Sequence, residues 1–145
     1  MRILSWNSRG LANAGGVRVL RDLIHREVPN LVFVMETKLL TYKLEQLKYG
    51  FGFYSCLSVN CEGHSEGLGL FWICDIDLEL VSYSKHHFDA WVNDAVSRIK
   101  WRITAVYGHL EITKRYEVWN LLKQISAFIQ GPWFCFRDFN KILVQ

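Results

Sequence analysis

The sequence predicts a mixed α and β fold. Short apolar runs alternate with amphipathic stretches along the chain, which is typical of a domain that packs helices against strands. Half of the 145 residues are hydrophobic and 21% are charged, a composition that excludes a disordered chain. A chain of this length forms one domain or part of one, and it buries enough surface for a real core.

The first part of the chain predicts a strand, a helix and a second strand. Residues 2–6 predict the first strand, and the turn-forming residues 10–16 predict a loop after it. Pro29 ends the helix that follows. The apolar residues of this helix recur at helical spacing: Val17, Leu20, Ile24 and Val28. Residues 31–35 are apolar without interruption, which predicts a buried strand.

The middle of the chain predicts one short helix and a series of strands. We expect Thr41 to cap a helix over residues 41–48, and residues 51–59 predict a third strand. Residues 97–105 alternate between polar and apolar, so the strand that contains them is expected to be half exposed. The further strands are expected at residues 67–73, 78–84, 88–92 and 96–106.

The last part predicts a helix followed by a short strand. The helix is expected over residues 113–129, and Gly131 and Pro132 end it. One face of it carries Trp119, Leu122, Ile125 and Ile129. Residues 133–136 predict the final strand.

Composition limits the function classes. The net charge of +3 permits contact with nucleic acid but does not indicate it, because no dense block of Lys and Arg is present. No apolar run approaches the ~20 residues of a membrane-spanning helix, and the N-terminus lacks the pattern of a signal peptide. We therefore expect no membrane partner and a cytoplasmic or nuclear location.

The four cysteines allow two interpretations. Reduced buried thiols are the simpler one, since Cys74 and Cys135 lie in apolar runs. The alternative is a zinc site, although its spacing matches no common zinc motif. Its ligands would be Cys56, Cys61, His64 and Cys74.

Isolated polar residues follow the apolar strands. They are Asn7, Glu36, Tyr107, Asp138 and Asn140. Strand ends and the loops after them are common positions for functional sites in layered α/β folds. If these ends converge, the donors are all oxygen and nitrogen, which suits Mg²⁺ or Mn²⁺ rather than Zn²⁺. Such a metal neutralises phosphate charge and lowers the pKa of a bound water, and an Asp beside an Asn orients that water.

Each of these residues also has a purely structural interpretation. Asn7 can bond a turn backbone, and Glu36 can be an ordinary loop carboxylate. Tyr107 can be a core aromatic residue with a solvated hydroxyl. Asp138 and Asn140 can cap a following helix.

Four short motifs resemble the endonuclease/exonuclease/phosphatase superfamily. They are ILSWNSRGL at residues 3–11, LVFVMETK at 31–38, VYG at 106–108 and RDFN at 137–140. More closely, the chain resembles the endonuclease domain of plant LINE-type retroelements, to which residues 17–23 and 80–88 are also similar. The ordered set is specific, whereas any one motif alone is weak.

The resemblance implies a fold of two packed β-sheets flanked by helices, a four-layer sandwich. It implies that residues 1–145 are the N-terminal portion of a single domain, without the Ser-Asp-His type motif of its second part. The implied activity is cleavage of DNA phosphodiesters with Mg²⁺ or Mn²⁺ and no small organic cofactor. DNA is therefore the expected partner.

The resemblance also assigns roles to the polar residues. Glu36 is the principal metal ligand with Asn7 beside it, and Tyr107 contacts the scissile phosphate. Asp138 orients or activates the attacking water, and Asn140 positions the phosphate and the water.

Two features depart from the family pattern. Arg137 stands where the family usually has Gly, and it can pair with Asp138, crowd the phosphate pocket or point to solvent. None of the five histidines lies in a Ser-Asp-His type motif, and His86 and His87 would face opposite sides of a strand.

Three functions therefore remain open. They are a metal-dependent endonuclease, an inactive retroelement-derived fragment, and a nucleic-acid binding module without catalysis. The last would use a loose group of cations, namely Arg98, Lys100, Arg102, Lys114 and Arg115.

Overall fold

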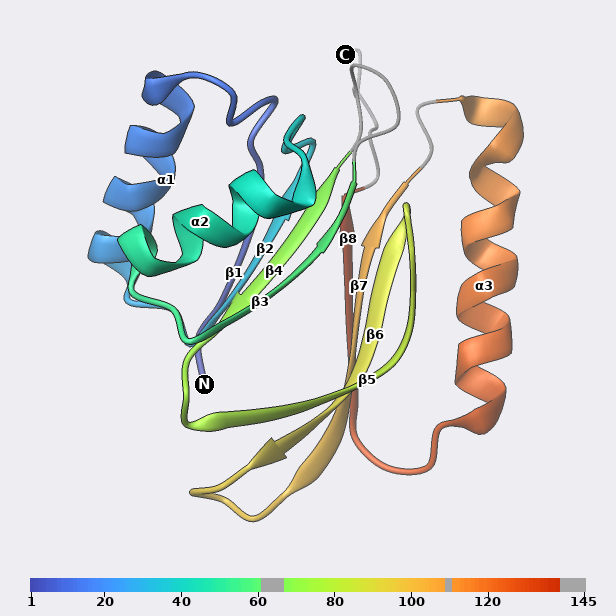
Figure 1. The fold of residues 1–145 in the computed structure, drawn as a ribbon. Helices are drawn as coiled ribbons and strands as arrows, with labels where there is room; N and C mark the ends of the chain where they lie inside the picture. Colours follow the sequence, from blue (N-terminus) through green and yellow to red (C-terminus); the bar gives the residue numbers. More distant parts are fainter. Residues whose placement is uncertain (61–66, 109–110, 139–145) are drawn as a thin grey trace. The chain divides into compact units, whose positions relative to one another are not determined.

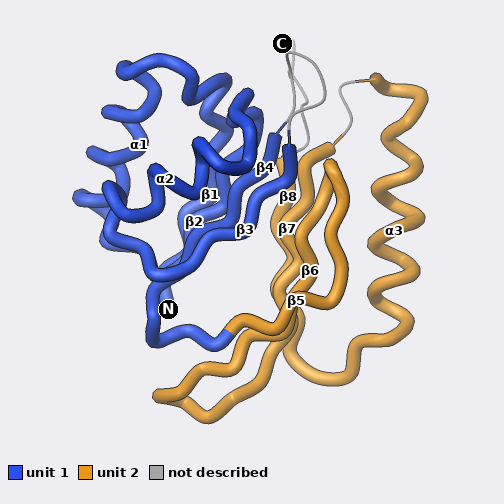
Figure 2. The backbone as a smooth tube through the Cα atoms, viewed as in Figure 1, with its two compact units in different colours: residues 1–77 blue, residues 78–145 orange. Residues whose placement is uncertain are grey.

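A computed structural model describes residues 1–60, 67–108 and 111–138 (Figure 1). The chain divides into two compact units, residues 1–77 and 78–145 (Figure 2). Each unit is built on a four-stranded sheet that contains both parallel and antiparallel pairs. The predicted mixed α and β fold class is thus confirmed.

Unit 1 has the strand order β1-β2-β4-β3. β1 and β2 are parallel, and β4 runs antiparallel to both β2 and β3. Its elements in chain order are β1 (Ile3–Asn7), α1 (Ala14–Glu27), β2 (Leu31–Met35), α2 (Thr41–Phe51), β3 (Ser55–Val59) and β4 (Leu68–Trp72). The strand predicted at residues 31–35 therefore has the observed bounds, and the first strand differs from its prediction by one residue at each end.

Helix α1 has a side-chain cap at its N-terminus and a strained residue at its end. The Asn13 side chain accepts a hydrogen bond from the backbone N–H of Gly16 at 2.8 Å. The helix ends at Val28, which has a left-handed φ of 46°, and Pro29 follows. Because of the Asn13 cap, the helix begins at Ala14, inside the segment predicted as a loop.

The predicted Thr41 cap is wrong. Leu40 occupies the N-cap position of α2 and makes no side-chain cap bond. The side chain of Asn60, the residue after β3, caps the helix instead. Its Oδ1 accepts hydrogen bonds from Thr41 N at 2.8 Å and from Thr41 Oγ1 at 2.6 Å. The helix also runs on to Phe51, so the strand predicted from residue 51 begins only at Ser55. Gly52, with φ of 80°, forms the helix C-cap.

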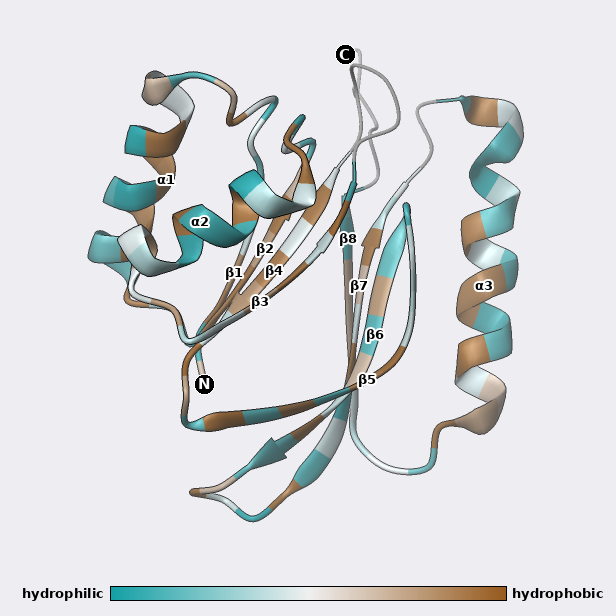
Figure 3. Cartoon of the chain, in the orientation of Figure 1, coloured by the Kyte–Doolittle hydropathy of each residue, from teal (hydrophilic) through white to brown (hydrophobic). Residues whose placement is uncertain are grey.

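Both helices of unit 1 lie on the same side of its sheet (Figure 1). Figure 3 shows hydrophobic residues along the side of α1 that faces this sheet. The buried cluster beneath the helices includes Leu20, Ile24, Val32, Val34, Leu44 and Phe71. Leu44 packs closely on Gly69 of β4, where a Cβ would lie 2.6 Å from Leu44 Cδ2 and the leucine side chain would have to shift. This close approach positions α2 against the sheet.

Unit 2 has the strand order β5-β6-β7-β8. β6 and β7 are antiparallel, whereas β7 and β8 are parallel. Its elements are β5 (Ile76–Ser84), β6 (His87–Asp94), β7 (Lys100–Tyr107), the 3₁₀ turn η1 (Ile112–Lys114), α3 (Arg115–Phe128) and β8 (Trp133–Asp138). α3 lies along one face of this sheet (Figure 1).

The strand predicted over residues 96–106 begins four residues late, at Lys100. The Asp94 carboxylate accepts hydrogen bonds from Val96 N at 2.9 Å and from Ser97 Oγ at 2.8 Å, which fold residues 94–97 into a turn. The bond from Ser97, followed by those from the backbone, lowers the pKa of Asp94 below its ordinary value. Among the described residues, no helix is long and apolar enough to cross a membrane.

Candidate functional site

The side chains of Asn7 and Glu36 meet at one edge of the unit 1 sheet. β1 and β2 are parallel with Asn7 opposite Met35, so the carboxyl ends of both strands reach the same edge. Asn7 Nδ2 donates a hydrogen bond to Glu36 Oε1 at 2.9 Å. Both residues are half-buried. The structure therefore brings together the two residues that the sequence predicts as the metal-binding pair.

A backbone donor fixes the orientation of the Asn7 amide. Arg9 N donates to Asn7 Oδ1 at 3.1 Å, and an N–H group can only be a donor. The amide oxygen therefore faces the loop after β1, and the amide nitrogen faces the Glu36 carboxylate. In this arrangement the Asn7 amide fixes the position of the Glu36 carboxylate by donating a hydrogen bond to it.

The Ser8 hydroxyl locks the backbone that carries Glu36. Ser8 Oγ lies 3.0 Å from Met35 O and 3.0 Å from Glu36 O, so its single proton is shared between two carbonyl groups. Ser8 N donates to the same Met35 O at 3.0 Å. The loop after β1 and the loop after β2 are therefore joined directly beside the Asn7–Glu36 pair.

Thr37 ties the second loop to two other segments. Leu11 N donates to Thr37 O at 2.9 Å, and Thr37 N donates to Gly67 O at 3.0 Å. Thr37 is completely buried, with 0% of its surface exposed. The backbone on both sides of Glu36 is thus held by hydrogen bonds.

Three residues of these two loops have a left-handed backbone without being glycine. Arg9, Glu36 and Lys38 have φ of 51°, 52° and 53°. Such a conformation costs energy for residues with a Cβ, and it commonly occurs where function fixes the position of a side chain. The strain around Glu36 therefore supports a functional role for this edge.

Tyr107 and Asp138 lie at the corresponding ends of two parallel strands in unit 2. They are direct partners in the register of β7 and β8, and Gly108 N donates to Asp138 O at 3.1 Å. Tyr107 is 2% exposed, and its ring stacks on the His86 ring with centroids 6.5 Å apart. His86 O also accepts from Tyr107 N at 2.7 Å.

Arg137 is directed toward α3. Its guanidinium lies over the Trp119 ring, 4.4 Å from the centroid. Neighbouring residues on a strand point to opposite faces, so Asp138 lies on the face of β8 away from α3. Desolvation by burial is the main cause that lowers the pKa of Arg137 below its ordinary value.

Some predicted positions lie outside the described residues. Asn140 is one of them, as are Cys61 and His64 of the zinc alternative. Burial raises the pKa of the Cys56 thiol to about 12, so this sulfur stays protonated at neutral pH. Within residues 1–60, 67–108 and 111–138 there is no group of three His, Cys, Asp or Glu side chains arranged for a metal.

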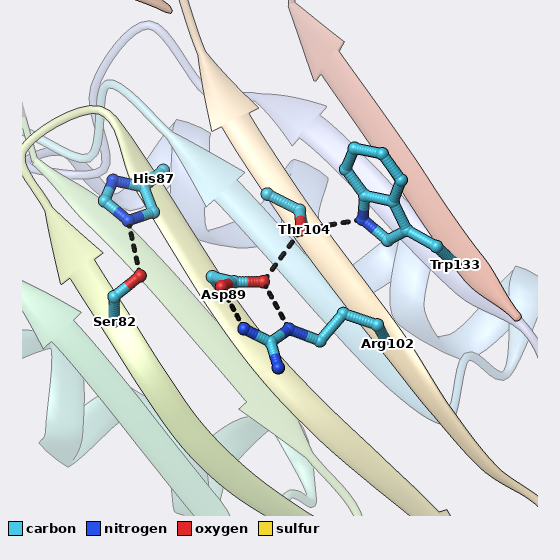
Figure 4. Close-up of polar contacts among 6 residues, drawn as sticks. All are labelled: Ser82, His87, Asp89, Arg102, Thr104 and Trp133. Carbon is cyan, nitrogen blue, oxygen red and sulfur yellow. Dashed lines mark hydrogen bonds and ion pairs between the residues drawn. The ribbon is translucent and has the colours of Figure 1, made fainter. Parts of the chain in front are cut away.

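The sequence did not allow a buried ion pair in unit 2 to be predicted. Arg102 Nε and Nη2 donate to the two oxygens of Asp89, at 2.9 and 2.6 Å (Figure 4). Thr104 Oγ1 donates to Asp89 Oδ1 at 2.8 Å and accepts from Trp133 Nε1 at 2.9 Å. The strand register places all four residues on the same face as Arg137.

The alternation over residues 97–105 was the signal for this strand, but it predicted half-exposed polar side chains. Arg102 and Thr104 are instead 7% and 0% exposed, because each has a buried partner on a neighbouring strand. The burial of Arg102 and Thr104 depends on Asp89 of the neighbouring strand β6, and a single sequence does not show which strands pair.

His86 and His87 were predicted to face opposite sides of one strand, but only His87 lies in β6, because residues 85 and 86 form a turn. His87 is buried, and its Nε2 lies 3.0 Å from Ser82 Oγ (Figure 4). Its Nδ1 lies 2.7 Å from Ser84 Oγ. Burial lowers the pKa of His87, and the nearby Asp89 charge partly opposes this. His86 lies in the turn before β6, next to Tyr107.

The Glu36 carboxylate at the edge of the unit 1 sheet is a suitable ligand for a hard divalent cation. Mg²⁺ is typically held by one or two carboxylates and keeps several waters, so it does not need a cage of protein ligands. The Glu36 carboxylate is half-buried, oriented by Asn7 and carried on a locked backbone. These are the properties of a pre-organised metal ligand.

Comparison with known proteins gives a match at the level of structure. No protein-family model and no curated protein matches this chain. The catalytic domain of human Nocturnin has a TM-score of 0.72 at 14% identity, over 98% of this chain and 64% of that chain.

Two proteins of Bacteroides thetaiotaomicron are similar in the same way. An endonuclease/exonuclease/phosphatase family protein has a TM-score of 0.67 at 14% identity, over 97% of this chain and 63% of that chain. A mannosyl-6-phosphatase has a TM-score of 0.67 at 15% identity, over 97% and 65% of the two chains. This chain therefore has the fold of endonuclease/exonuclease/phosphatase proteins and spans a little less than two thirds of their length.

Proposed function

We propose that this chain is the part of a divalent-metal-dependent phosphoesterase that carries the metal-binding carboxylate. The observation that carries the proposal is the Asn7–Glu36 pair, held at 2.9 Å on a locked and strained backbone. The fold supports it, because solved proteins of this fold include a phosphatase. The ordered motifs of the sequence support it independently.

DNA is the substrate that we propose, with Mg²⁺ or Mn²⁺ as the metal. The support for DNA and for a retroelement origin is the resemblance of the motifs to LINE-type endonucleases. A bound Mg²⁺ would neutralise phosphate charge and make a coordinated water more acidic. Glu36 would hold it, and Asn7 would keep the carboxylate in place through its Nδ2–H.

Residues of unit 2 supply the remaining roles in this proposal. Asp138 orients or activates the attacking water, and Tyr107 contacts the scissile phosphate. Asn140 positions the phosphate and the water, an assignment that rests on its place in the RDFN motif alone. We therefore treat Glu36 as the primary test of the proposal and Asp138 as the second.

The test is nicking of supercoiled plasmid by residues 1–145 with Mg²⁺, with Mn²⁺ and with EDTA. Cleavage by this part of the site would require metal, and Glu36→Gln and Asp138→Asn would abolish it. Glu27→Gln is the matched control, because Glu27 is an exposed carboxylate at the far end of α1. Nicking by the purified protein that persists in Glu36→Gln would show that Glu36 is not required for cleavage and would overturn the proposal.

Metal binding gives a second readout that does not depend on turnover. Titration of Mn²⁺ followed by electron paramagnetic resonance should show a site that Glu36→Gln removes and that Asn7→Ala weakens roughly 10–100-fold. A chain that binds Mn²⁺ through Glu36 without nicking DNA would favour the inactive-fragment alternative. A chain that binds DNA but not metal would favour the binding-module alternative.

A further inference from the structure

We propose that unit 1 carries a nucleotide-binding surface beside Glu36. In this proposal Arg9 and Lys38 hold a backbone phosphate, and a neighbouring pocket beside Tyr42 takes one unstacked base. The choice of a nucleic-acid ligand rests on the proposed function. The surface itself is argued from the loops after β1 and β2 and from helix α2.

The two cations are held in position by the backbone. Arg9 and Lys38 are both exposed, and both have the left-handed φ that glycine adopts most easily. Arg9 N is bonded to Asn7, and the Lys38 stem lies against Gly10, where a Cβ would be 3.3 Å from Lys38 Cδ. A long cationic residue at such a position is costly, so its charge is the property that an anionic ligand would use.

The two cations lie next to the pocket along the chain. Leu11 and Leu39, which follow Gly10 and Lys38, both line a pocket of about 350 Å³. Leu47, Ala12 and Val17 extend the apolar lining, and Tyr42, Lys43 and Gln46 of α2 add polar groups to it. An anion held by Arg9 and Lys38 would therefore have an apolar-floored cavity beside it.

The lining suits a nucleobase. Tyr42 is 55% exposed although it is aromatic, so it offers a ring on which a base can stack. Gln46 offers an amide donor and acceptor for a base edge, and Lys43 adds a third positive charge at the rim. Phosphate contacts by cations together with stacking on an aromatic ring are the usual features of single-strand binding.

Binding of a fluorescein-labelled single-stranded oligonucleotide tests this surface. Fluorescence anisotropy is measured in EDTA between roughly 50 and 200 mM KCl. Arg9→Gln and Lys38→Gln should each weaken binding, and the double variant should reduce the salt slope by about 0.7, the value for one phosphate contact on a single strand. Tyr42→Ala should weaken binding roughly tenfold at every salt concentration, with the slope unchanged, because stacking releases no counterions.

Matched controls isolate the surface. Tyr49→Ala removes a tyrosine of the same helix that is 76% exposed but does not line this pocket, so it should leave binding unchanged. Lys123→Gln removes an exposed lysine of α3 and should leave the salt slope unchanged. Tyr42→Phe keeps the ring and should retain the affinity, and circular dichroism checks that each variant is folded.

Several outcomes would overturn the surface. They are no binding by the unaltered chain, equal losses in Tyr42→Ala and Tyr49→Ala, or a change in salt slope with no effect of Tyr42→Ala. These failures differ from failure of the proposed function, since the assay contains no metal and no cleavage. Glu36-dependent nicking without a Tyr42 effect would leave the function standing and reject the base pocket. Binding that depends on Tyr42, without Glu36-dependent nicking, would support the nucleotide-binding surface and reject the proposed hydrolysis.

Discussion

The guanidinium of Arg137 lies over the indole ring of Trp119, 4.4 Å from its centroid. This contact directs the side chain toward α3, whereas Asp138 points to the opposite face of β8. None of the three interpretations that the sequence allowed for Arg137 included an aromatic partner. The Arg137 cation is therefore part of the packing between β8 and α3.

Arg137→Gly should accordingly change stability more than chemistry. We expect a loss of about 0.5–1 kcal/mol, the value of a cation–π pair at a partly exposed site. Urea denaturation of Arg137→Gly, Trp119→Leu and the double variant forms a cycle that isolates the pair. Additive losses in this cycle would show that the two side chains do not interact.

Val28→Gly should stabilise the protein by about 0.5–1 kcal/mol. Val28 is 66% exposed and β-branched, yet it has φ of 46°, where glycine has no steric penalty. Val19→Gly is the control, because Val19 lies within α1 and the same change there should destabilise by about 0.5 kcal/mol. Thermal unfolding of both variants gives the two signs directly.

Removal of one partner of the Asp89–Arg102 ion pair should destabilise unit 2 by about 3–5 kcal/mol, since the other charge stays buried. Asp89→Leu combined with Arg102→Met should be more stable than either single variant, because it leaves no buried charge. The measurement is the midpoint of urea unfolding. A double variant that loses the sum of both single losses would contradict this account.

His87 should make stability depend on pH. Burial lowers its pKa below the ordinary 6.5, so below about pH 6.5 the unfolded chain binds more protons than the folded one. The contribution of neutral His87 to the free energy of unfolding is therefore fully present above this pH, and it is lost as the pH decreases below it.

The measurement is the free energy of unfolding between about pH 5 and 8 for the unaltered chain and for the His87→Asn and His25→Asn variants. His87→Asn should flatten the dependence relative to the unaltered chain. His25→Asn should not, because His25 is an exposed residue of α1. A curve for His87→Asn as steep as that of the unaltered chain would assign the dependence to another group.

The parts of the fold that the sequence predicts well depend on local patterns. β2 is a run of five apolar residues, and its predicted bounds are the observed ones. The cap of α2 was not predictable in the same way, because its acceptor, Asn60, is 19 residues away from Thr41. The approach of Leu44 to Gly69 is likewise a contact between distant segments.

The candidate site shows the same division. The motifs identified Asn7 and Glu36, and the parallel pairing of β1 and β2 brings them together. The motifs did not identify the left-handed backbone of Arg9 and Lys38, since neither arginine nor lysine is a residue type that signals this conformation. Residues 139–145 lie outside the described part of the chain, so the role of Asn140 stays a prediction.

The hydrogen bonds described around Glu36 join residues that all lie between Asn7 and Gly67. Substitutions that accumulate in residues 78–145 therefore leave this set of donors and acceptors unchanged. If the proposed function holds, such substitutions can remove catalysis from related chains while the donors and acceptors around Glu36 persist. An intact Glu36 loop in a related chain would then be evidence of common descent, and evidence of activity would have to come from residues 78–145.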